Sequence, residues 1–251
     1  MNHEKVYCAG TTIAIKYAKQ YLKQLGIPVS ETPEWDTKHL LLDIPSFRDG
    51  FLRSGRSMDT LLSSLPGDII VWGGNLDHPA LNGLRTVDLL KDEQYLAQNA
   101  AITAHCALTL AVPLLRKPLA HTPTLIIGWG RIGKCLGQKL KAIGNDVIIA
   151  TRNSSHQSAL QSLGYRSIDS SQILSVLPEI QLIFNTAPSP VLSTEQTSMC
   201  NDCILMDLAS QRGIEGDNVI WARGLPGIHA PESSGKLIAD TIIRLMKEAD
   251  V

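Results

Sequence analysis

Residues 124–153 read TLIIGWGRIGKCLGQKLKAIGNDVIIATRN, and this stretch decides the fold class. It contains an apolar strand, a glycine-rich turn, a helical segment closed by Gly144, and a second apolar strand. Elements alternate in this way in βαβ units, where a right-handed crossover helix joins two parallel strands. The stretch therefore predicts a parallel sheet with helices packed on it.

The turn Gly128-Trp129-Gly130-Arg131-Ile132-Gly133 matches the GxGxxG pattern of dinucleotide sites. The first glycine allows the tight turn, the second lets backbone approach the pyrophosphate, and the third lets helix and strand pack closely. The amides at the start of the helix then face the anion. Because the motif lies between a strand and a helix in a βαβ unit of about 30 residues, we expect these six residues to bind a dinucleotide. A purely structural turn is the alternative.

The second strand of this unit ends at Thr151, where NAD-preferring proteins place an acid that binds the adenosine ribose. Arg152, Asn153 and Ser154 follow, and they supply a guanidinium, a hydroxyl and a new helix N-terminus suited to a 2′-phosphate. We therefore expect these four residues to bind NADP(H), with NAD(H) as the second choice. A solvated basic loop that ignores the ribose is the alternative.

Two later strands end in polar segments, Asn185-Thr186-Ala187-Pro188 and Asp207-Leu208-Ala209-Ser210. In open parallel sheets, ligands bind outside the carboxyl ends of the strands. We expect the cofactor to contact Thr186, Ala187, Pro188, Asp207 and Leu208, and Asn185 is a catalytic candidate. Ordinary turn formation is the alternative for both segments.

The expected substrate contacts are Ser210, Arg212 and the run Gly224-Leu225-Pro226-Gly227. A guanidinium matches a carboxylate in a two-pronged geometry, so Arg212 is the main carboxylate candidate, with Arg48, Arg53 and Arg56 as weaker ones. The glycines and prolines of residues 224–231 predict a loop that brings rigid backbone close to a ligand or reverses the chain. His229 is a second catalytic candidate because histidine exchanges protons near neutral pH.

The hydrophobic pattern predicts an α/β protein: a Rossmann doubly wound parallel sheet plus a smaller N-terminal α/β, flavodoxin-like domain. The expected boundaries are 1–91 for the N-terminal domain, 92–118 for an interdomain helix, 119–229 for the Rossmann domain and 230–251 for a helix that returns to the first domain. Short strands are expected within 5–10, 39–44, 68–74, 84–89, 179–185 and 202–208, a helix over 11–25, and a loop over 46–57.

Composition narrows the function classes. The 251 residues include 23 basic and 24 acidic side chains, so nothing favours a nucleic-acid or membrane-surface partner. The apolar stretch 102–115 is too short to cross a membrane, and the N-terminus lacks a signal pattern, so we expect a cytoplasmic protein. Five cysteines fit a reducing compartment. Cys200 and Cys203 form a CxxC without a second pair, so we expect buried thiols and no metal site.

The segments GWGRIG, TRNSSH, NTAP, DLAS and GLPGIHAPESSGKLIADTI together resemble the A subunit of dipicolinate synthase over about residues 125–245. The resemblance implies an NADP-binding Rossmann protein that works with a second, flavoprotein-like B subunit. It implies oxidation of dihydrodipicolinate to the aromatic dicarboxylate in spore-forming bacteria, and homo-oligomerisation is left open. Where the family tends to have a glutamate after a Thr-Ala pair, this chain has His105.

Two other functions stay open at this point. A D-2-hydroxyacid dehydrogenase shares the domain order, but an arginine, an acid and a histidine are expected after its glycine motif, and here no acid clearly accompanies His229. A protein that binds NADP and supports a partner without catalysis is the third candidate.

Overall fold

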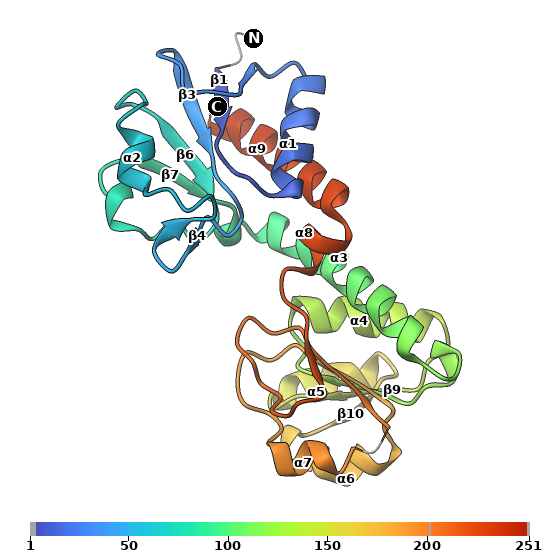
Figure 1. Ribbon diagram of the computed structural model, residues 1–251. Helices are drawn as coiled ribbons and strands as arrows, with labels where there is room; N and C mark the ends of the chain where they lie inside the picture. Colours follow the sequence, from blue (N-terminus) through green and yellow to red (C-terminus); the bar gives the residue numbers. More distant parts are fainter. Residues whose placement is uncertain (1–3, 201, 250–251) are drawn as a thin grey trace. The chain divides into compact units, whose positions relative to one another are not determined.

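The computed structural model describes residues 4–200 and 202–249, and the chain divides into two compact units (Figure 1). The first unit comprises Met1–Asn99 with Pro226–Val251, and the second comprises Ala100–Leu225. We describe each unit by itself. The domain boundaries expected from the sequence, 1–91, 92–118, 119–229 and 230–251, stay predictions.

The first unit is built on a parallel sheet. Its strands are β1 (Lys5–Cys8), β2 (Val29–Ser30), β3 (Thr37–Leu41), β6 (Ile70–Gly73) and β7 (Arg85–Asp88), and its helices include α1 (Ile13–Gln24), α2 (Met58–Leu62) and α9 (Pro231–Ala249). Within the described residues the strand order is β2-β1-β3-β6-β7 with every pairing parallel. This is the flavodoxin-like order expected for the N-terminal domain. Buried leucines and Met58 fill one side of the sheet.

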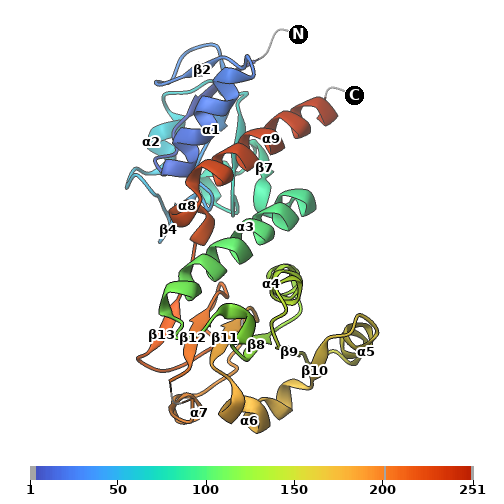
Figure 2. The same ribbon diagram turned by 90° about the vertical axis from the view of Figure 1, so that its right-hand side faces the viewer.

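Helix α9 packs along α1, and the two lie side by side in both ribbon views (Figures 1 and 2). The contact is close because Gly235 has no side chain. A Cβ at this position would lie 2.4 Å from Tyr17 Cβ and 2.5 Å from the Ala14 carbonyl oxygen. Arg244 of α9 also donates to Asp92 Oδ1 at 2.6 Å. The C-terminal helix is therefore part of the packing of the first unit.

The second unit contains the predicted βαβ unit and four further strands. Its strands are β8 (Thr124–Ile127), β9 (Val147–Ala150), β10 (Arg166–Ile168), β11 (Leu182–Asn185), β12 (Ile204–Asp207) and β13 (Val219–Trp221), and its helices are α4 (Arg131–Ala142), α5 (Ser154–Ser162), α6 (Ile173–Val176) and α7 (Thr194–Ser198). In the part of the chain that the structure describes, their order is β10-β9-β8-β11-β12-β13, all parallel. This is the order of the doubly wound dinucleotide-binding sheet. Successive strands are added on one side of β8 as far as β10, and from β11 onward they are added on the other side. The predicted fold class is confirmed.

The chain passes from the first unit to the second within helix α3 (Glu93–Ala111). It returns to the first unit within helix α8 (Leu225–His229). Short 3₁₀ turns complete the connections, at Pro79–Leu81, Leu89–Lys91, Val112–Leu114, Leu119–His121, Ser170–Gln172 and Leu177–Glu179. In the described residues, no helix is both long enough and apolar enough to cross a membrane.

Strand register lines up the carboxyl ends of the second sheet. Ile127 pairs with both Ala150 and Asn185, Asn185 pairs with Asp207, and Asp207 pairs with Trp221. These five residues form one row, and the loops that follow them leave the sheet at the same edge. In a parallel sheet, this edge is where ligands bind.

Two expected loops contain regular structure. The segment expected as a loop over 46–57 holds an antiparallel hairpin, β4 (Phe47–Arg48) with β5 (Phe51–Leu52), because Asp49 and Gly50 adopt positive φ and reverse the chain. The segment 224–231 contains α8, since only Gly224 takes the left-handed conformation and the helix begins directly after it.

The Gly235 contact yields a stability prediction. In an open helix, alanine is more stable than glycine by about 1 kcal/mol. Here the added methyl overlaps α1, so we expect Gly235→Ala to lower the free energy of unfolding by roughly 1–3 kcal/mol. Urea denaturation followed by far-UV circular dichroism measures this difference.

Gly67→Ala is the matched control, because a Cβ at Gly67 has nothing within 4 Å. The control is expected to stay within about 0.5 kcal/mol of the wild type. A Gly235→Ala protein as stable as the wild type would contradict the close packing of α9 on α1.

Candidate functional site

Each glycine of the turn has a separate structural reason. Gly128 has φ of +102°, and a Cβ there would lie 2.6 Å from Thr186 Oγ1. A Cβ on Gly133 would lie 2.3 Å from the Gly128 carbonyl oxygen. The first and third glycines therefore let α4 begin directly against the end of β8, as the dinucleotide fingerprint requires.

Gly130 differs from its two neighbours in the motif. It is the N-cap of α4 with extended backbone, φ of −80° and ψ of −167°, and no side chain caps the helix there. A Cβ built on Gly130 has nothing within 4 Å. The glycine thus leaves open space in front of an uncapped 12-residue helix, whose first amides and dipole attract an anion. This geometry fits the pyrophosphate of a dinucleotide.

Thr186 holds the turn from the neighbouring strand. Its Oγ1 donates to the carbonyl oxygens of Ile127 and Gly128 at 3.1 and 3.3 Å, and its amide donates to the Ile127 carbonyl at 2.8 Å. Because β11 pairs with β8 on the side away from β9, this contact connects the loop after β11 to the glycine turn. Ala187 is half-buried beside Thr186, and Pro188 is exposed.

Trp129 points back onto the helix rather than toward the open side of the turn. A Cβ on Gly137 of α4 would lie 2.9 Å from the Trp129 ring, and Trp129 meets Tyr165 edge to face at 5.5 Å between ring centroids. Burial raises the pKa of the Tyr165 phenol. Arg131 is exposed at the first position of α4, and Ile132 is half-buried.

The end of β9 carries the residues expected to meet the adenosine ribose. Thr151 is 6% exposed, and its Oγ1 accepts from the Asn153 amide at 3.3 Å. Asn153 caps α5, because its Oδ1 accepts from the amides of Ser155 and His156. The N-terminus of α5 is therefore already capped by the chain itself. Arg152 and Ser154 are the exposed groups that remain for a phosphate, and Arg152 has no hydrogen bond or ion pair with any residue that the structure describes.

Asp169 lies close to this end of the site, and it was not among the expected residues. Gln157 joins it to Thr151, donating to the Thr151 carbonyl at 2.8 Å and to Asp169 Oδ2 at 3.1 Å. Hydrogen bonds from the Ser171 amide and hydroxyl and from Gln157 hold the pKa of Asp169 below its usual range. The capping-box pattern Asp169-Ser-Ser-Gln172 was the sequence signal for this residue.

A buried carboxylate organises the loops after β11 and β12. Asp207 is fully buried and accepts from the amides of Gly213, Ile214 and Ala209 at 2.6, 2.9 and 3.0 Å. It also accepts from Asn185 Nδ2 at 3.0 Å.

Asn185, the first catalytic candidate, uses both of its Nδ2 hydrogens in the loops, on Asp207 and on the Ala187 carbonyl. Asn185 and Asp207 thus connect the loops after β11 and β12, and the catalytic role of Asn185 stays a prediction. Leu208 is buried beside them, and its amide donates to the Asn185 carbonyl.

The expected substrate residues do not all present free groups. Arg212 donates to the carbonyls of Ile214 and Gly216 at 3.0 and 2.6 Å, so much of its guanidinium is engaged in its own loop. Ser210 is exposed, whereas Leu225 is 2% exposed at the start of α8. His229 ends α8 and is exposed. The substrate and catalytic roles of these residues stay predictions.

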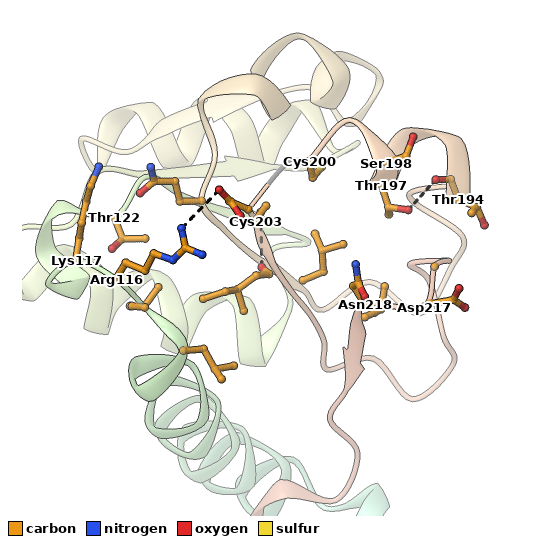
Figure 3. Close-up of a pocket in the computed structure, with 18 residues that line it drawn as sticks. Arg116, Lys117, Thr122, Thr194, Thr197, Ser198, Cys200, Cys203, Asp217 and Asn218 are labelled. Atoms are coloured by element: carbon orange, nitrogen blue, oxygen red, sulfur yellow. Dashed lines mark hydrogen bonds and ion pairs between the residues drawn. The ribbon is translucent and has the colours of Figure 1, made fainter.

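A cavity of about 690 Å³ lies at the opposite edge of the same sheet (Figure 3). Ile204 and Val219, the first residues of β12 and β13, line it together with Arg116, which lies 3.7 Å from Asp202. Cys200 and Cys203 also line this cavity, and burial raises the pKa of Cys203 to about 12. Because the cavity adjoins the amino ends of the strands, it is separate from the glycine turn.

The Asp207 network gives the second prediction. In Asp207→Asn, an amide NH₂ replaces one acceptor among backbone donors, and a lost hydrogen bond to a charged group costs about 1.5–3 kcal/mol. We expect that loss in the free energy of unfolding, together with faster hydrogen exchange at Gly213 and Ile214. Urea denaturation and exchange followed by mass spectrometry measure the two effects.

Asp217→Asn is the matched control, since Asp217 is exposed and lines the cavity at the other edge. Unchanged protection of Gly213 and Ile214 in Asp207→Asn would show that the carboxylate does not hold this loop.

Comparison with known proteins shows what the chain is similar to. No family model matches the chain. The chain is 25% identical over 201 residues to the A subunit of dipicolinate synthase from Bacillus subtilis. The match covers 74% of this chain and 68% of the relative.

Solved structures share the fold. The dipicolinate synthase A subunit from Bacillus halodurans superposes with a TM-score of 0.84 and 19% identity over 97% of both chains. A transhydrogenase from Sinorhizobium meliloti gives 0.74 at 16% identity over 98% of this chain and 94% of that one. The NAD complex of a D-isomer-specific 2-hydroxyacid dehydrogenase from Lactobacillus delbrueckii ssp. bulgaricus gives 0.56 at 11% identity over 98% and 97%. The predicted resemblance to the A subunit of dipicolinate synthase, within an architecture shared with 2-hydroxyacid dehydrogenases, is therefore confirmed.

Proposed function

We propose that this protein is a nicotinamide-dependent oxidoreductase of the same type as the A subunit of dipicolinate synthase, and that it binds NADP(H) at the turn 128–133. The observation that carries the proposal is the open space in front of Gly130 at the uncapped start of α4. That space lies at the end of β8, where the strand order β10-β9-β8-β11-β12-β13 switches sides. Dinucleotides bind at this point in doubly wound sheets. A bound nicotinamide would supply hydride transfer.

The residues of this chain would bind and orient the cofactor. The amides at the start of α4 would face the pyrophosphate, and Thr186 would keep the turn in place. Arg152 and Ser154 would meet the 2′-phosphate at the end of β9. Asp207 and Asn185 would hold the loops that border the nicotinamide.

The expected substrate is a small dicarboxylate of the dihydrodipicolinate type. The Bacillus subtilis relative is, by its name, one subunit of a synthase, and we propose a flavoprotein-like B subunit as the partner of this chain. A non-catalytic NADP-binding role is the second candidate, since the donors of Asn185 are engaged and His229 is exposed, with no acidic partner among the residues that the structure describes. Reduction of NADP⁺ by the isolated chain with a dihydrodipicolinate, measured with and without the B subunit, separates the two, because a non-catalytic chain reduces none by itself.

One observation favours NAD(H) instead. Asp169 is held charged near Thr151 through Gln157, and its carboxylate would repel a 2′-phosphate placed beside it. The exposed guanidinium of Arg152 acts in the opposite direction. The balance of these two charges decides the choice of cofactor.

The first test of this proposal changes Gly130 to valine. The added side chain would fill the space that the pyrophosphate needs, so we expect no NADPH binding at concentrations that saturate the wild type. Because the Cβ meets no protein atom, the fold is expected to survive. Fluorescence titration measures binding, and circular dichroism verifies folding. A folded Gly130→Val protein with wild-type affinity would place the phosphate site elsewhere.

The second test changes Arg152 to alanine. A charge-assisted hydrogen bond to phosphate accounts for about ten- to a hundredfold in affinity. We expect Arg152→Ala to weaken NADPH binding by that factor and to leave NADH binding nearly unchanged. Asp169→Asn serves as the opposite control and is expected to strengthen NADPH binding. If the wild type binds NADH at least as tightly as NADPH in calorimetric titration, the NADP assignment is wrong.

A further inference from the structure

Trp221 is the last residue of β13 and stands in the same row of strand ends as Asn185 and Asp207. Its indole Nε1 donates to the Ala209 carbonyl oxygen at 3.3 Å, which fixes the ring against the loop after β12. The residue is still 44% exposed. A large aromatic side chain is thus anchored at the ligand-binding edge of the sheet with part of its surface uncovered.

Arg223 places its guanidinium over this ring, with the Arg223 Cζ 5.1 Å from the Trp221 ring centroid. The side chain is exposed, and it has no hydrogen bond or ion pair with any residue between 4 and 249 that the structure describes. Stacking on an aromatic face orients the planar guanidinium and leaves its N–H edges available. Arg212, by contrast, already donates to carbonyls of its own loop.

The position of the pair fits the far end of the cofactor site. The adenosine half is expected at β9, so the other half would extend from the turn toward β11 and β12. Strands lie about 4.8 Å apart, which places β12 about 10 Å and β13 about 14 Å from β8. The Trp221–Arg223 pair would therefore lie on the nicotinamide side, one strand beyond the DLAS loop.

We infer that Arg223, oriented by Trp221, binds a carboxylate of the substrate and selects small anionic ring compounds. This inference rests on the proposed function. It deepens that function by making Arg223, rather than Arg212, the positively charged residue that binds the substrate carboxylate. The guanidinium donates in its own plane to the carboxylate, and the exposed part of the indole offers an apolar face to the ring of the substrate.

The test measures binding of pyridine-2,6-dicarboxylate to the full chain, with saturating NADPH, by calorimetry. Loss of a guanidinium–carboxylate contact is expected to weaken binding by about tenfold or more in Arg223→Ala. Trp221→Ala removes the platform and is expected to weaken binding less. Trp221→Phe retains a ring, so we expect it to restore part of the lost affinity. The neutral pyridine-2,6-dicarboxamide is expected to bind poorly to the wild type and to each of these variants.

Arg116→Ala is the charge-matched control, because Arg116 lies at the other edge of the same sheet. It is expected to bind the dicarboxylate like the wild type. NADPH affinity, measured separately, is expected to change less than about twofold in Arg223→Ala, since that variant removes a substrate contact only.

Two results would overturn the inference: a wild type that binds NADPH but no dicarboxylate, and an Arg223→Ala protein with wild-type dicarboxylate affinity. If Arg212→Ala loses the affinity instead, the carboxylate lies on the loop after β12. A wild type that binds no nicotinamide cofactor contradicts the proposed function, and dicarboxylate binding without cofactor then decides the role of Arg223 separately.

Discussion

The close approach of α4 to the end of β8 is the constraint on which the candidate site depends. Gly133 lies so near the Gly128 carbonyl that a single Cβ would come within 2.3 Å of its oxygen, and Thr186 donates to the same carbonyl from the next strand. Once this contact forms, the helix must start directly above the sheet edge with its first amides facing outward. Gly130 then keeps the space in front of those amides open.

A second buried interaction sets the rest of that edge. Asp207 has no basic partner among the contacts that the structure describes, and four N–H groups surround its carboxylate. Charge-assisted hydrogen bonds of this kind hold irregular loops in one conformation. The loops after β11 and β12 therefore stay fixed relative to the glycine turn, and the indole of Trp221 is anchored to one of them.

Much of this arrangement was predictable because its signals are local. The βαβ unit around the glycine motif, the final helix from residue 231 and the strands ending at Asn185 and Asp207 follow from apolar runs and glycine positions. Strands β10 and β13 were missed because they are short and only partly buried. The engagement of Arg212 and the stacking of Arg223 on Trp221 could not be read from the sequence, because each depends on how a loop folds over a neighbouring strand.

Hydrogen exchange of the full chain with and without NADPH tests the glycine turn as the cofactor site, because it reports where the cofactor binds without any substitution. We expect added protection in peptides that cover residues 128–134 and 186–187, with smaller changes at 151–155 and none at the cavity beside Arg116. Protection confined to that cavity, or no protection at the glycine turn under saturating NADPH, would show that the cofactor does not bind at this turn.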